Sequence, residues 1–361
     1  MLSLISWISV GALGLITGSF LNAVIHRLPR GISLLNPKRS FCPGCGKTIP
    51  WHENLPVASW LLLRGHCSGC TMPIAIRYPL VELLTSGLYL LSWALVGLPL
   101  APIYWIFFSL LIAATFIDFD HLIIPDEITV GGVVTGVVSA TILPSLLGAT
   151  VWWQGMLLSF LGAAMGYFLL WGVVELGKLA FGKRRIHSAE PLSLELGERE
   201  DGITLKLDEE EMPLEEFFSR NSDRVEASCL WLEVAGERFE AGHLVIGSNR
   251  VIYGEREWSF GVLPAQPALR AEVTELILPR EAMGFGDVKF LACIGAFLGW
   301  KGVLFSLFGG SLVGAVVGIS MLLATRGRSG GKIPFGPYLA LGAFIWVIAG
   351  PQFLAFYLGN R

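Results

Sequence analysis

Long apolar runs separated by polar loops make up most of this chain of 361 residues. A run of about 17 to 25 apolar residues is long enough to cross the hydrocarbon core of a bilayer as a helix. The pattern predicts about eight such spans, near residues 2–24, 79–97, 101–117, 128–146, 152–181, 287–299, 302–325 and 334–358. The sixth run is short, so we expect its ends to continue into the flanking loops. The chain is therefore predicted to be an α-helical polytopic membrane protein.

The composition agrees with this prediction. Hydrophobic residues make up 53% of the chain and charged residues 15%, with a mean hydropathy of +0.62, which is outside the range of ordinary soluble domains. No basic segment precedes the first run and no small-residue cleavage site follows it, so we interpret it as a retained span and not a removable signal peptide. No lipidation motif is found at either end.

Basic residues predict how the spans are oriented, because cytoplasmic loops of membrane proteins carry an excess of Lys and Arg. The loop before the last span holds Arg326, Arg328 and Lys332, and the loop after the first span is also basic, with Arg27, Arg30, Lys38, Arg39, Lys47, Arg64 and Arg77. We expect both loops to lie in the cytoplasm. An even number of spans then places both termini outside, on the periplasmic side.

A polar stretch at residues 183–281 interrupts the apolar pattern. It carries 12 Lys and Arg against 21 Asp and Glu, a net charge of −9, while the remainder carries +6. Short β-rich runs at residues 202–207, 230–234 and 243–246 alternate with turn signals at Gly236, residues 247–249 and Gly254. We expect a small, mostly β cytoplasmic insertion without a dinucleotide, P-loop or nucleic-acid motif. The predicted segments are 1–24, 25–78, 79–182, 183–281 and 282–361.

Four of the six cysteines form two CxxC pairs with 21 residues between the pairs: Cys42, Cys45, Cys67 and Cys70. Two thiolates from each of two tight turns complete a tetrahedral site, so this spacing predicts structural Zn²⁺. Disulfides are the alternative, which a reducing cytoplasm disfavours. Cys293 falls within an apolar run and is expected to pack in the core.

Two carboxylates, Asp118 and Asp287, lie where an apolar run meets a loop, at the same predicted level of the membrane. A charge at such depth is costly unless it is paired, protonated or facing water. Two adjacent carboxyl groups share a proton and serve as base and acid together. Gly284 and Gly286 remove side chains next to Asp287 and permit close approach of a substrate. The residues alone leave open an aspartyl peptidase, an ion path in a transporter, and simple helix capping.

The neighbouring polar residues have several interpretations. Asp120, Asp126 and Glu127 suit helix ends, and Asp126 directly follows Pro125 at the start of the fourth span. Pro334 and Gly336 keep the backbone irregular before the last span, so they either line the site or only start a helix. Glu82 is expected to form an interfacial ion pair with Arg77.

Taken together, these residues resemble the type IV prepilin peptidases, which are bifunctional leader peptidases and N-methyltransferases and intramembrane aspartyl proteases of the GxGD type. Five groups of motifs occur in order: Gly18-Ser19-Phe20-Leu21-Asn22 with His26-Arg27-Leu28-Pro29, the CxxC pairs with Glu53-Asn54-Leu55-Pro56-Val57, Arg77-Tyr78-Pro79-Leu80-Val81-Glu82-Leu83, Ile117-Asp118-Phe119-Asp120-His121 with Pro125-Asp126, and Gly284-Phe285-Gly286-Asp287-Val288-Lys289. The resemblance covers nearly all of the membrane body.

The resemblance implies that Asp118 and Asp287 form the catalytic dyad of an enzyme in the bacterial inner membrane. The implied substrates are prepilins or pseudopilins of a type IV pilus or type II secretion system, with a basic leader that is cut after Gly at the cytoplasmic face. It also implies methylation of the new N-terminus with S-adenosylmethionine, with the zinc region as the candidate site. No methyl-donor motif is present, so no residue is assigned to that cofactor.

The insertion at residues 183–281 departs from the family, in which a short connection occupies this place. Its negative charge could attract basic leaders, or it could dock a pilus or secretion-system protein; no nucleic-acid partner is expected. The alternatives to a bifunctional enzyme are a peptidase without methyltransferase activity and an ion-coupled transporter.

Overall fold

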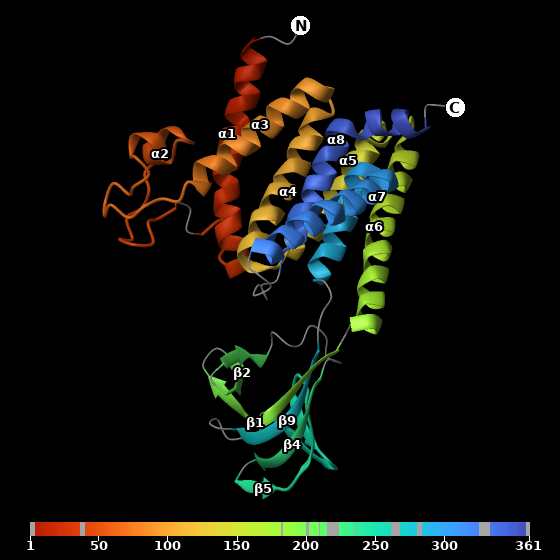
Figure 1. Ribbon diagram of the computed structural model, residues 1–361. Coiled ribbons are helices and arrows are strands. Elements are labelled where there is room, and N and C mark those ends of the chain that lie inside the picture. Colours follow the sequence, from red (N-terminus) through yellow and green to blue (C-terminus); the bar gives the residue numbers. More distant parts are fainter. Residues whose placement is uncertain are drawn as a thin grey trace. The chain divides into compact units, whose positions relative to one another are not determined.

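The computed structural model describes most of the chain, namely residues 4–36, 40–181, 183–199, 202–208, 210–214, 224–234, 236–260, 268–279, 284–324 and 333–358. The chain folds into two compact units (Figure 1). Residues 1–172 and 283–361 make up the helical unit, and residues 173–282 make up the sheet unit.

The helical unit is built from long apolar helices and one short helix, α2. The bounds are α1 Leu4–Arg27, α2 Ala58–Leu62, α3 Arg77–Val96, α4 Ala101–His121, α5 Asp126–Ile142, α6 Trp152–Phe181, α7 Phe285–Ala324 and α8 Gly336–Leu358. The division between the two units falls within α6, at residue 173. Five of these helices, α1, α3, α4, α6 and α7, are long and apolar enough to cross a membrane. Helix α5 has 17 residues, and α8 contains a shorter apolar stretch over Gly336–Gly350.

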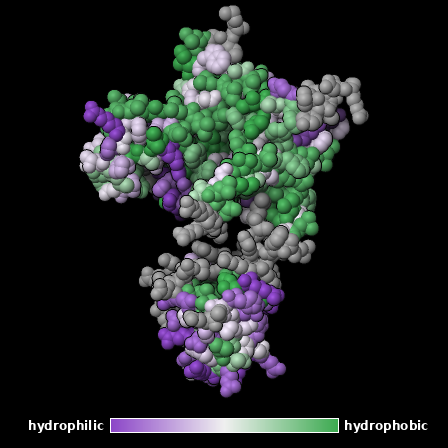
Figure 2. Space-filling view, in the orientation of Figure 1, coloured by the Kyte–Doolittle hydropathy of each residue, from purple (hydrophilic) through white to green (hydrophobic). Residues whose placement is uncertain are grey.

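The surface of this unit is suited to lipid. Figure 2 shows hydrophobic residues over most of its visible face, whereas the sheet unit displays many hydrophilic ones. Large apolar side chains such as Ile5, Phe168 and Phe308 are more than 60% exposed. Contiguous apolar surface of this kind is rare in soluble proteins, so the helical unit is built to lie in a membrane.

The predicted sixth and seventh spans are joined without a loop. Helix α7 runs over both of them and is interrupted at Gly299, whose backbone is not helical, with φ 67° and ψ −177°. Glycine adopts such a positive φ without the clash that a Cβ would cause. The chain therefore changes direction at Gly299, where the hydropathy pattern predicts the end of one span and, three residues later, the start of the next.

Small residues let α7 approach its neighbours closely. A methyl group on Gly162 of α6 would collide with the carbonyl oxygen of Gly295, and the Ser159 hydroxyl donates to the Ala296 carbonyl over 2.7 Å. Close contacts of this kind hold membrane helices together, where lipid removes the hydrophobic driving force. Cys293 is fully buried against Gly132 of α5, which confirms its predicted role in packing.

The sheet unit confirms the prediction of a β-rich insertion. Its strands are β1 Lys183–Arg199, β2 Gly202–Leu207, β3 Glu210–Pro213, β4 Val225–Val234, β5 Glu237–Phe239, β6 Gly242–Ile246, β7 Arg250–Tyr253, β8 Arg256–Ser259 and β9 Leu269–Pro279. They form one antiparallel sheet in the order β3-β2-β1-β9-β4-β6-β7-β8, with β5 paired to β4. Two of the predicted turns contain Gly236 and Gly254, both with positive φ.

Alternate side chains of the central strands face opposite sides of the sheet. One side buries an apolar cluster that includes Leu194, Leu232 and Val273. The other side carries a row of alternating charges across neighbouring strands, in the order Lys206, Glu195, Arg270, Glu233 and Arg238. Arg270 Nε lies 3.1 Å from Glu195 Oε1. Opposite charges that face each other across strands stabilise a sheet, so this row is largely neutralised within the unit.

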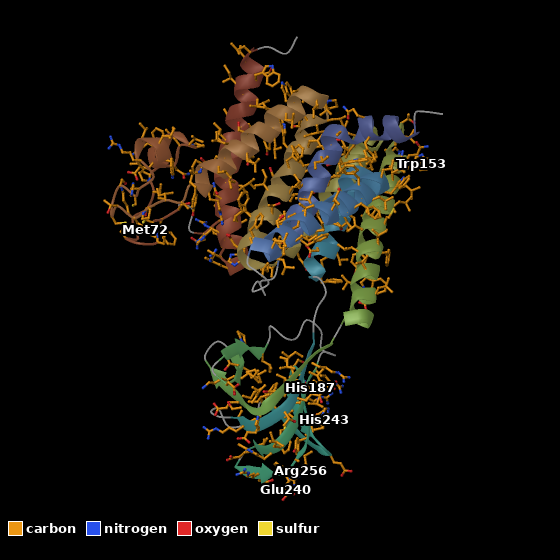
Figure 3. The ribbon with its side chains drawn as sticks, viewed as in Figure 1. Met72, Trp153, His187, Glu240, His243 and Arg256 are labelled. Carbon is orange, nitrogen blue, oxygen red and sulfur yellow. The ribbon has the colours of Figure 1, made fainter. Side chains whose placement is uncertain are left out.

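Two histidines of the sheet unit, His187 and His243, lie near carboxylates of neighbouring strands (Figure 3). His187 of β1 lies 3.4 Å from a carboxylate oxygen of Glu275, and His243 of β6 lies 3.9 Å from one of Glu226. Each of these two carboxylates has a histidine within ion-pair distance, which carries a positive charge only when it is protonated.

Candidate functional site

Asp118 lies in the last turn of α4 and is only 5% exposed. Its Oδ2 accepts a hydrogen bond of 2.9 Å from the backbone N–H of Gly336, the first residue of α8. The first N–H groups of a helix have no partner within the helix, and here a carboxylate 218 residues away supplies one. Asp118 is thereby fixed between the end of α4 and the start of α8.

Asp287 lies in the first turn of α7 and is 8% exposed. Its Oδ1 is buried and has no hydrogen-bond partner among the described residues. Asp287 is close enough to Asp118 for the two charges to interact. Buried polar atoms are rarely left unpaired, and those that are often belong to groups that act on a ligand. The structure therefore brings the two predicted acids together and leaves one oxygen available.

Two glycines lie beside the acids at positions where there is little or no room for a side chain. A Cβ added to Gly336 would lie 2.7 Å from Asp118 Oδ2 and 2.9 Å from Ile124 Cδ1, closer than real Cβ contacts. A Cβ added to Gly286 would lie 3.2 Å from the backbone nitrogen of Ile124. The loop after α4 is thus packed against the starts of both α7 and α8, and the site is assembled from three distant parts of the chain.

Gly284 and Pro334 are less constrained. A Cβ on Gly284 would make an ordinary contact of 3.7 Å with Asp287 Oδ2. Pro334 lies half-buried in the non-helical segment before α8. Gly284 is close to Asp287 in sequence and Pro334 is close to Gly336, and the described contacts give neither of them a direct part in holding the acids.

Asp120 forms an ion pair instead of capping a helix. Both of its oxygens accept hydrogen bonds from Arg77 Nη1, at 2.7 and 2.6 Å, and this pair joins the end of α4 to the start of α3. The predicted pair of Arg77 with Glu82 is therefore wrong. The carboxylate of Glu82 accepts a hydrogen bond from the backbone N–H of Val57 over 2.7 Å.

Asp126 lies in the first turn of α5, as predicted, and also binds a residue that sequence reasoning missed. Lys289 Nζ lies 2.6 and 2.8 Å from its two carboxylate oxygens, across 163 residues of sequence. Lys289 lies two residues after Asp287 in the same sequence motif, and this position was the sequence signal that could have identified it as a site residue. The pair joins the start of α5 to the first turn of α7.

The resemblance implies that Asp287 is catalytic. On that expectation, replacing Lys289 by Met should slow peptide cleavage about tenfold, because the first turn of α7 loses its link to α5 and small misplacements of reacting groups are costly. Stability should change little, since exposed ion pairs contribute at most about 1 kcal/mol. Activity and thermal unfolding of Lys289→Met, Asp126→Asn and the double variant provide the measurement. If the pair acts as one unit, the double variant is no slower than either single variant; independent, additive losses would contradict this role.

The four cysteines of the CxxC pairs form the candidate metal site. Their sulfur atoms all lie within 4.8 Å of one another, and Cys42 Sγ is 3.6 Å from Cys70 Sγ. A tetrahedral ion with bonds of about 2.3 Å holds its sulfurs about 3.8 Å apart, so the spacing fits a metal. All four thiols are free, which excludes the disulfide alternative for this structure.

The two CxxC turns have the same pattern of backbone hydrogen bonds. The N–H of Cys42 donates to the Lys47 carbonyl and that of Cys67 to the Met72 carbonyl, each over 2.9 Å. The left-handed position is Gly46 in the first turn and Thr71 in the second. Backbone N–H groups of Cys45 and Gly44 lower the pKa of the Cys42 thiol to about 7, which favours a thiolate at Cys42. Hydrogen bonds with the other three thiols raise the pKa of Cys70 to about 12.

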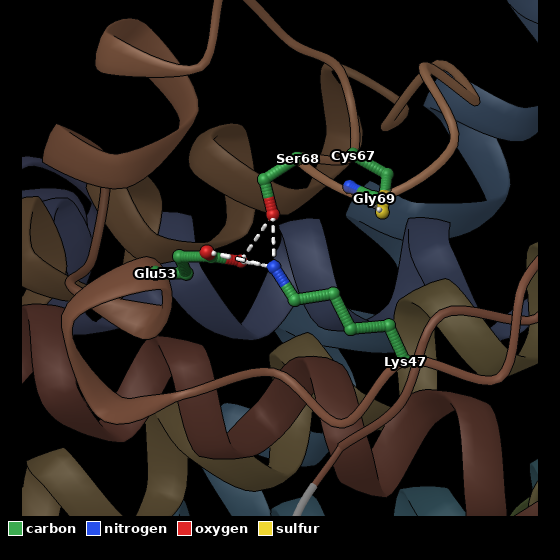
Figure 4. A network of polar contacts seen from close by, with 5 residues as sticks. All are labelled: Lys47, Glu53, Cys67, Ser68 and Gly69. Atoms are coloured by element: carbon green, nitrogen blue, oxygen red, sulfur yellow. Dashed lines mark hydrogen bonds and ion pairs between the residues drawn. The ribbon is translucent and has the colours of Figure 1, made fainter.

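A polar network holds the two turns against the segment between them (Figure 4). Lys47 Nζ donates to Ser68 Oγ over 2.6 Å and lies 3.0 Å from Glu53 Oε1, while Ser68 Oγ donates to Glu53 Oε2 over 2.7 Å. Hydrogen bonds from Ser68 and Lys47 lower the pKa of Glu53. Glu53 lies in the short 3₁₀ helix Trp51–Asn54, so this segment is fixed to both turns.

Cys42→Ser is expected to abolish stoichiometric metal binding, because three thiolates do not complete the tetrahedral set. Residues 40–76 should then become sensitive to protease before the helices lose structure, since bound metal contributes directly to the stability of such turns. Elemental mass spectrometry and limited proteolysis measure the two effects. Cys229→Ser, in the sheet unit, is the matched control and should retain the metal; full metal content in Cys42→Ser would refute the site.

Comparison with protein families places these residues in context. The model for the bacterial peptidase A24 N-terminal domain matches residues 12–96, which include the four cysteines. The model for the type IV leader peptidase family matches residues 105–184 and 258–319, which include both acids. The unmatched gap from 185 to 257 corresponds to most of the sheet unit.

Similar proteins occur in several bacteria under the name prepilin leader peptidase/N-methyltransferase. The protein of Aeromonas hydrophila is 32% identical, with 96% of this chain and 91% of that protein covered. Those of Aeromonas salmonicida strain A449 and Pseudomonas aeruginosa are 30% and 28% identical with the same coverage. No solved structure matches this chain.

Proposed function

This chain belongs to the family of prepilin leader peptidases/N-methyltransferases, and from that membership we propose that it removes the leader of prepilins or pseudopilins and methylates the new N-terminus. The proposed catalytic pair is Asp118 and Asp287. The observation that carries this assignment is two buried carboxyl groups from α4 and α7 within reach of each other's charge, one with an unpartnered oxygen.

The surroundings of the two acids favour different roles in peptide hydrolysis. The N–H of Gly336 supports a negative charge on Asp118, and Asp287 Oδ1 has no described donor. Asp118 therefore suits the general base that takes a proton from water, and Asp287 suits the acid. The hydroxide equivalent adds to the carbonyl carbon, and the leaving amine takes its proton from Asp287 as the C–N bond breaks.

Zn²⁺ is the metal that four thiolates at this spacing suit best. Cys42, Cys45, Cys67 and Cys70 would fill all four positions and leave none for a substrate, so the ion would stabilise residues 40–76. S-adenosylmethionine would supply the methyl group of the second reaction. A Zn²⁺ ion held in this way would support the segment between the two CxxC turns.

The chain is a multi-pass protein of the inner membrane, and we propose that residues 25–78 and 183–281 face the cytoplasm with both termini in the periplasm. Basic residues in the loops support this orientation. Asp120 and its partner Arg77 then mark the cytoplasmic ends of α4 and α3. Asp118 lies half a turn inside, at a depth suited to cutting between a basic leader and an apolar helix.

The test is cleavage of a model prepilin with a basic leader, a Gly-Phe junction and an apolar helix, in lipid-supplemented detergent with S-adenosylmethionine present. Mass spectrometry should find a product that begins after Gly and carries one added methyl group. Leader removal without the methyl group would support a peptidase alone. No cleavage by folded protein would reopen the transporter alternative.

Replacing the sheet unit tests whether it attracts basic leaders. Lys183 pairs with Pro279, and paired strands lie about 5 Å apart, so a short Gly-Ser linker can join residues 182 and 280. If the unit serves only to dock a partner protein, the shortened protein should cleave a free model prepilin at an unchanged rate between low and high salt. A loss of cleavage confined to low salt would show that the unit attracts leaders.

A further inference from the structure

Basic side chains gather where the ends of three helices meet, outside the acid pair. Helices α1, α3 and α4 pack against one another. His26 lies in the last turn of α1, Arg77 is the first residue of α3, and His121 is the last residue of α4. Arg30 follows α1 in the short 3₁₀ helix Leu28–Arg30. We call His26, Arg30, Arg77 and His121 the basic cluster.

His26 links the members of this cluster. Its Nδ1 is 3.2 Å from Arg30 Nη1, which also donates to the His26 carbonyl over 2.6 Å. The other groups whose charges act on His26 are Arg27, Arg77 and His121. All four neighbours are basic, and like charges gathered at the edge of a low-dielectric region repel one another. The cluster is therefore stabilised by a negative charge placed among its members.

The described carboxylates supply little of that charge. Asp120 is bound to Arg77 over 2.6 Å. In the part of the chain that the structure describes, no carboxylate lies within ion-pair distance of Arg30 or His26. Asp118 belongs to the acid pair, where its Oδ2 accepts a backbone N–H. The basic cluster therefore keeps an excess of positive charge.

Helix dipoles explain only part of this arrangement. The C-terminal end of a helix carries a partial negative charge that stabilises a basic group, which suits His26 at the end of α1 and His121 at the end of α4. Arg77 lies at the opposite, positive end of α3, where the same effect is unfavourable. Asp120 compensates Arg77, which leaves Arg30 and the two histidines without an acid.

His121 adds a nitrogen that has no partner. Its Nε2 is buried and forms no hydrogen bond with the described residues. Buried polar atoms are rarely left unpaired in folded proteins, and each such atom calls for an explanation such as a bound ligand or ion. Because the surroundings of His121 are rich in positive charge, an anion is the ligand that fits this nitrogen.

We propose that the basic cluster binds a phosphate group. A guanidinium donates two parallel hydrogen bonds to two phosphate oxygens. The described contacts of Arg30 use only Nη1, so Nε and Nη2 remain for this purpose. Arg30 has only donors, so neutral His26 accepts at Nδ1 and carries its proton on Nε2, which becomes a further donor to the phosphate.

Two sources supply such a group. In the proposed orientation the cluster lies at the cytoplasmic ends of its helices, where the anionic lipids of the inner leaflet attract basic segments. Either the headgroup of an anionic phospholipid or a soluble phosphate compound would compensate the charge. The proposal goes beyond cleavage and methylation and depends on neither, so binding is the quantity to measure.

The first arm of the test uses lipid. Phosphatidylglycerol, or phosphatidylcholine in parallel, is titrated into delipidated full-length protein in a nonionic detergent, and native mass spectrometry counts the bound lipid. Wild type should prefer phosphatidylglycerol. Arg30→Gln should weaken that binding about fivefold, because one basic residue at an anionic surface has an effect of about this size. Arg64→Gln is the matched control, since it removes an exposed arginine of the same basic loop outside the cluster and should bind normally.

The second arm uses inorganic phosphate. Thermal unfolding of the same delipidated protein is followed in sodium phosphate and in sodium chloride at matched ionic strength. A ligand that binds only the folded state raises Tm, so a specific increase in phosphate for wild type, absent in Arg30→Gln, would show that free phosphate fills the site. Preference for phosphatidylglycerol without this increase would identify the lipid headgroup as the source. Both results support the site.

A variant with the opposite expected effect guards against loss of structure. Asp120→Asn removes the one acid paired with the cluster and frees Arg77, so it should tighten binding about fivefold. A variant that merely damages the fold would unfold at a lower Tm in chloride and could only weaken binding. His121→Gln, which changes the unpartnered nitrogen, should weaken binding as Arg30→Gln does.

Three outcomes would overturn the proposal. Wild type could show neither a preference for phosphatidylglycerol nor a specific rise in Tm with phosphate, Arg30→Gln and His121→Gln could bind as wild type does, or Asp120→Asn could bind no more tightly than wild type. Failure of the proposed function would look different, because an inert peptidase with this site intact would still bind the phosphate group.

Discussion

Asp118→Asn and Asp287→Asn are each expected to lower cleavage of a model prepilin by about a thousandfold or more, because each removes one half of a general acid–base pair. The amide is nearly the size of the carboxylate, and in Asp118→Asn the amide oxygen would still accept the Gly336 N–H that the carboxylate accepts over 2.9 Å. The loss should therefore arise from proton transfer and not from packing. Time courses resolved by mass spectrometry measure it.

The design includes two controls. Glu127→Gln makes the same chemical change in the first turn of α5 and should cleave normally. Both Asp variants should still methylate a substrate that begins at the new N-terminus, which proves that they are folded. Cleavage within a fewfold of wild type by either Asp variant would exclude that residue as base or acid.

The two acids could be found from the sequence because each stands out locally, as a carboxylate at the end of an apolar run. The ion-pair partners of the charged residues next to these acids could not be found in this way. Arg77 and Asp120 are separated by 43 residues and Asp126 and Lys289 by 163, and hydropathy does not specify which helix ends meet. Both pairs follow from the packing of neighbouring helices, which is a property of the assembled bundle.

The incorrect pair of Arg77 with Glu82 has a geometric reason. Residues five apart on an α-helix point about 140° away from each other, so nearness in sequence does not bring these two side chains together. Arg77 instead faces α4, whereas Glu82 faces α1 and the segment between the two CxxC turns, which contains Val57. A helical projection would have argued against the pair, although it could not have named either true partner.

The sheet unit shows the same division between local and long-range information. Its β2 strand, Gly202–Leu207, and the turns at Gly236 and Gly254 agree with the sequence prediction, because alternation and glycine are local signals. The charge row from Lys206 to Arg238 depends on the register of five strands. Sequence counting gives a net −9 for the insertion and cannot reveal that charges of opposite sign alternate across its central strands.

Gly336→Ala is expected to reduce cleavage about a hundredfold, since displacing a catalytic group by about 1 Å has an effect of that size. The new methyl group would lie 2.7 Å from Asp118 Oδ2 and 2.9 Å from Ile124 Cδ1. Either Asp118 turns away from Asp287 or the start of α8 moves, and both disturb the hydrogen bond from residue 336. Cleavage kinetics, with thermal unfolding as the stability control, measure the effect.

The other two glycines make the prediction specific. Alanine at 286 would approach the Ile124 backbone to 3.2 Å, which a small shift of the loop can relieve, and alanine at 284 would make only an ordinary 3.7 Å contact with Asp287. The expected order of impairment is therefore Gly336→Ala, then Gly286→Ala, then Gly284→Ala. If Gly284→Ala were the most damaging, backbone freedom next to Asp287 would matter more than space around Asp118, and the close packing of α8 against α4 would not be what positions the acid pair.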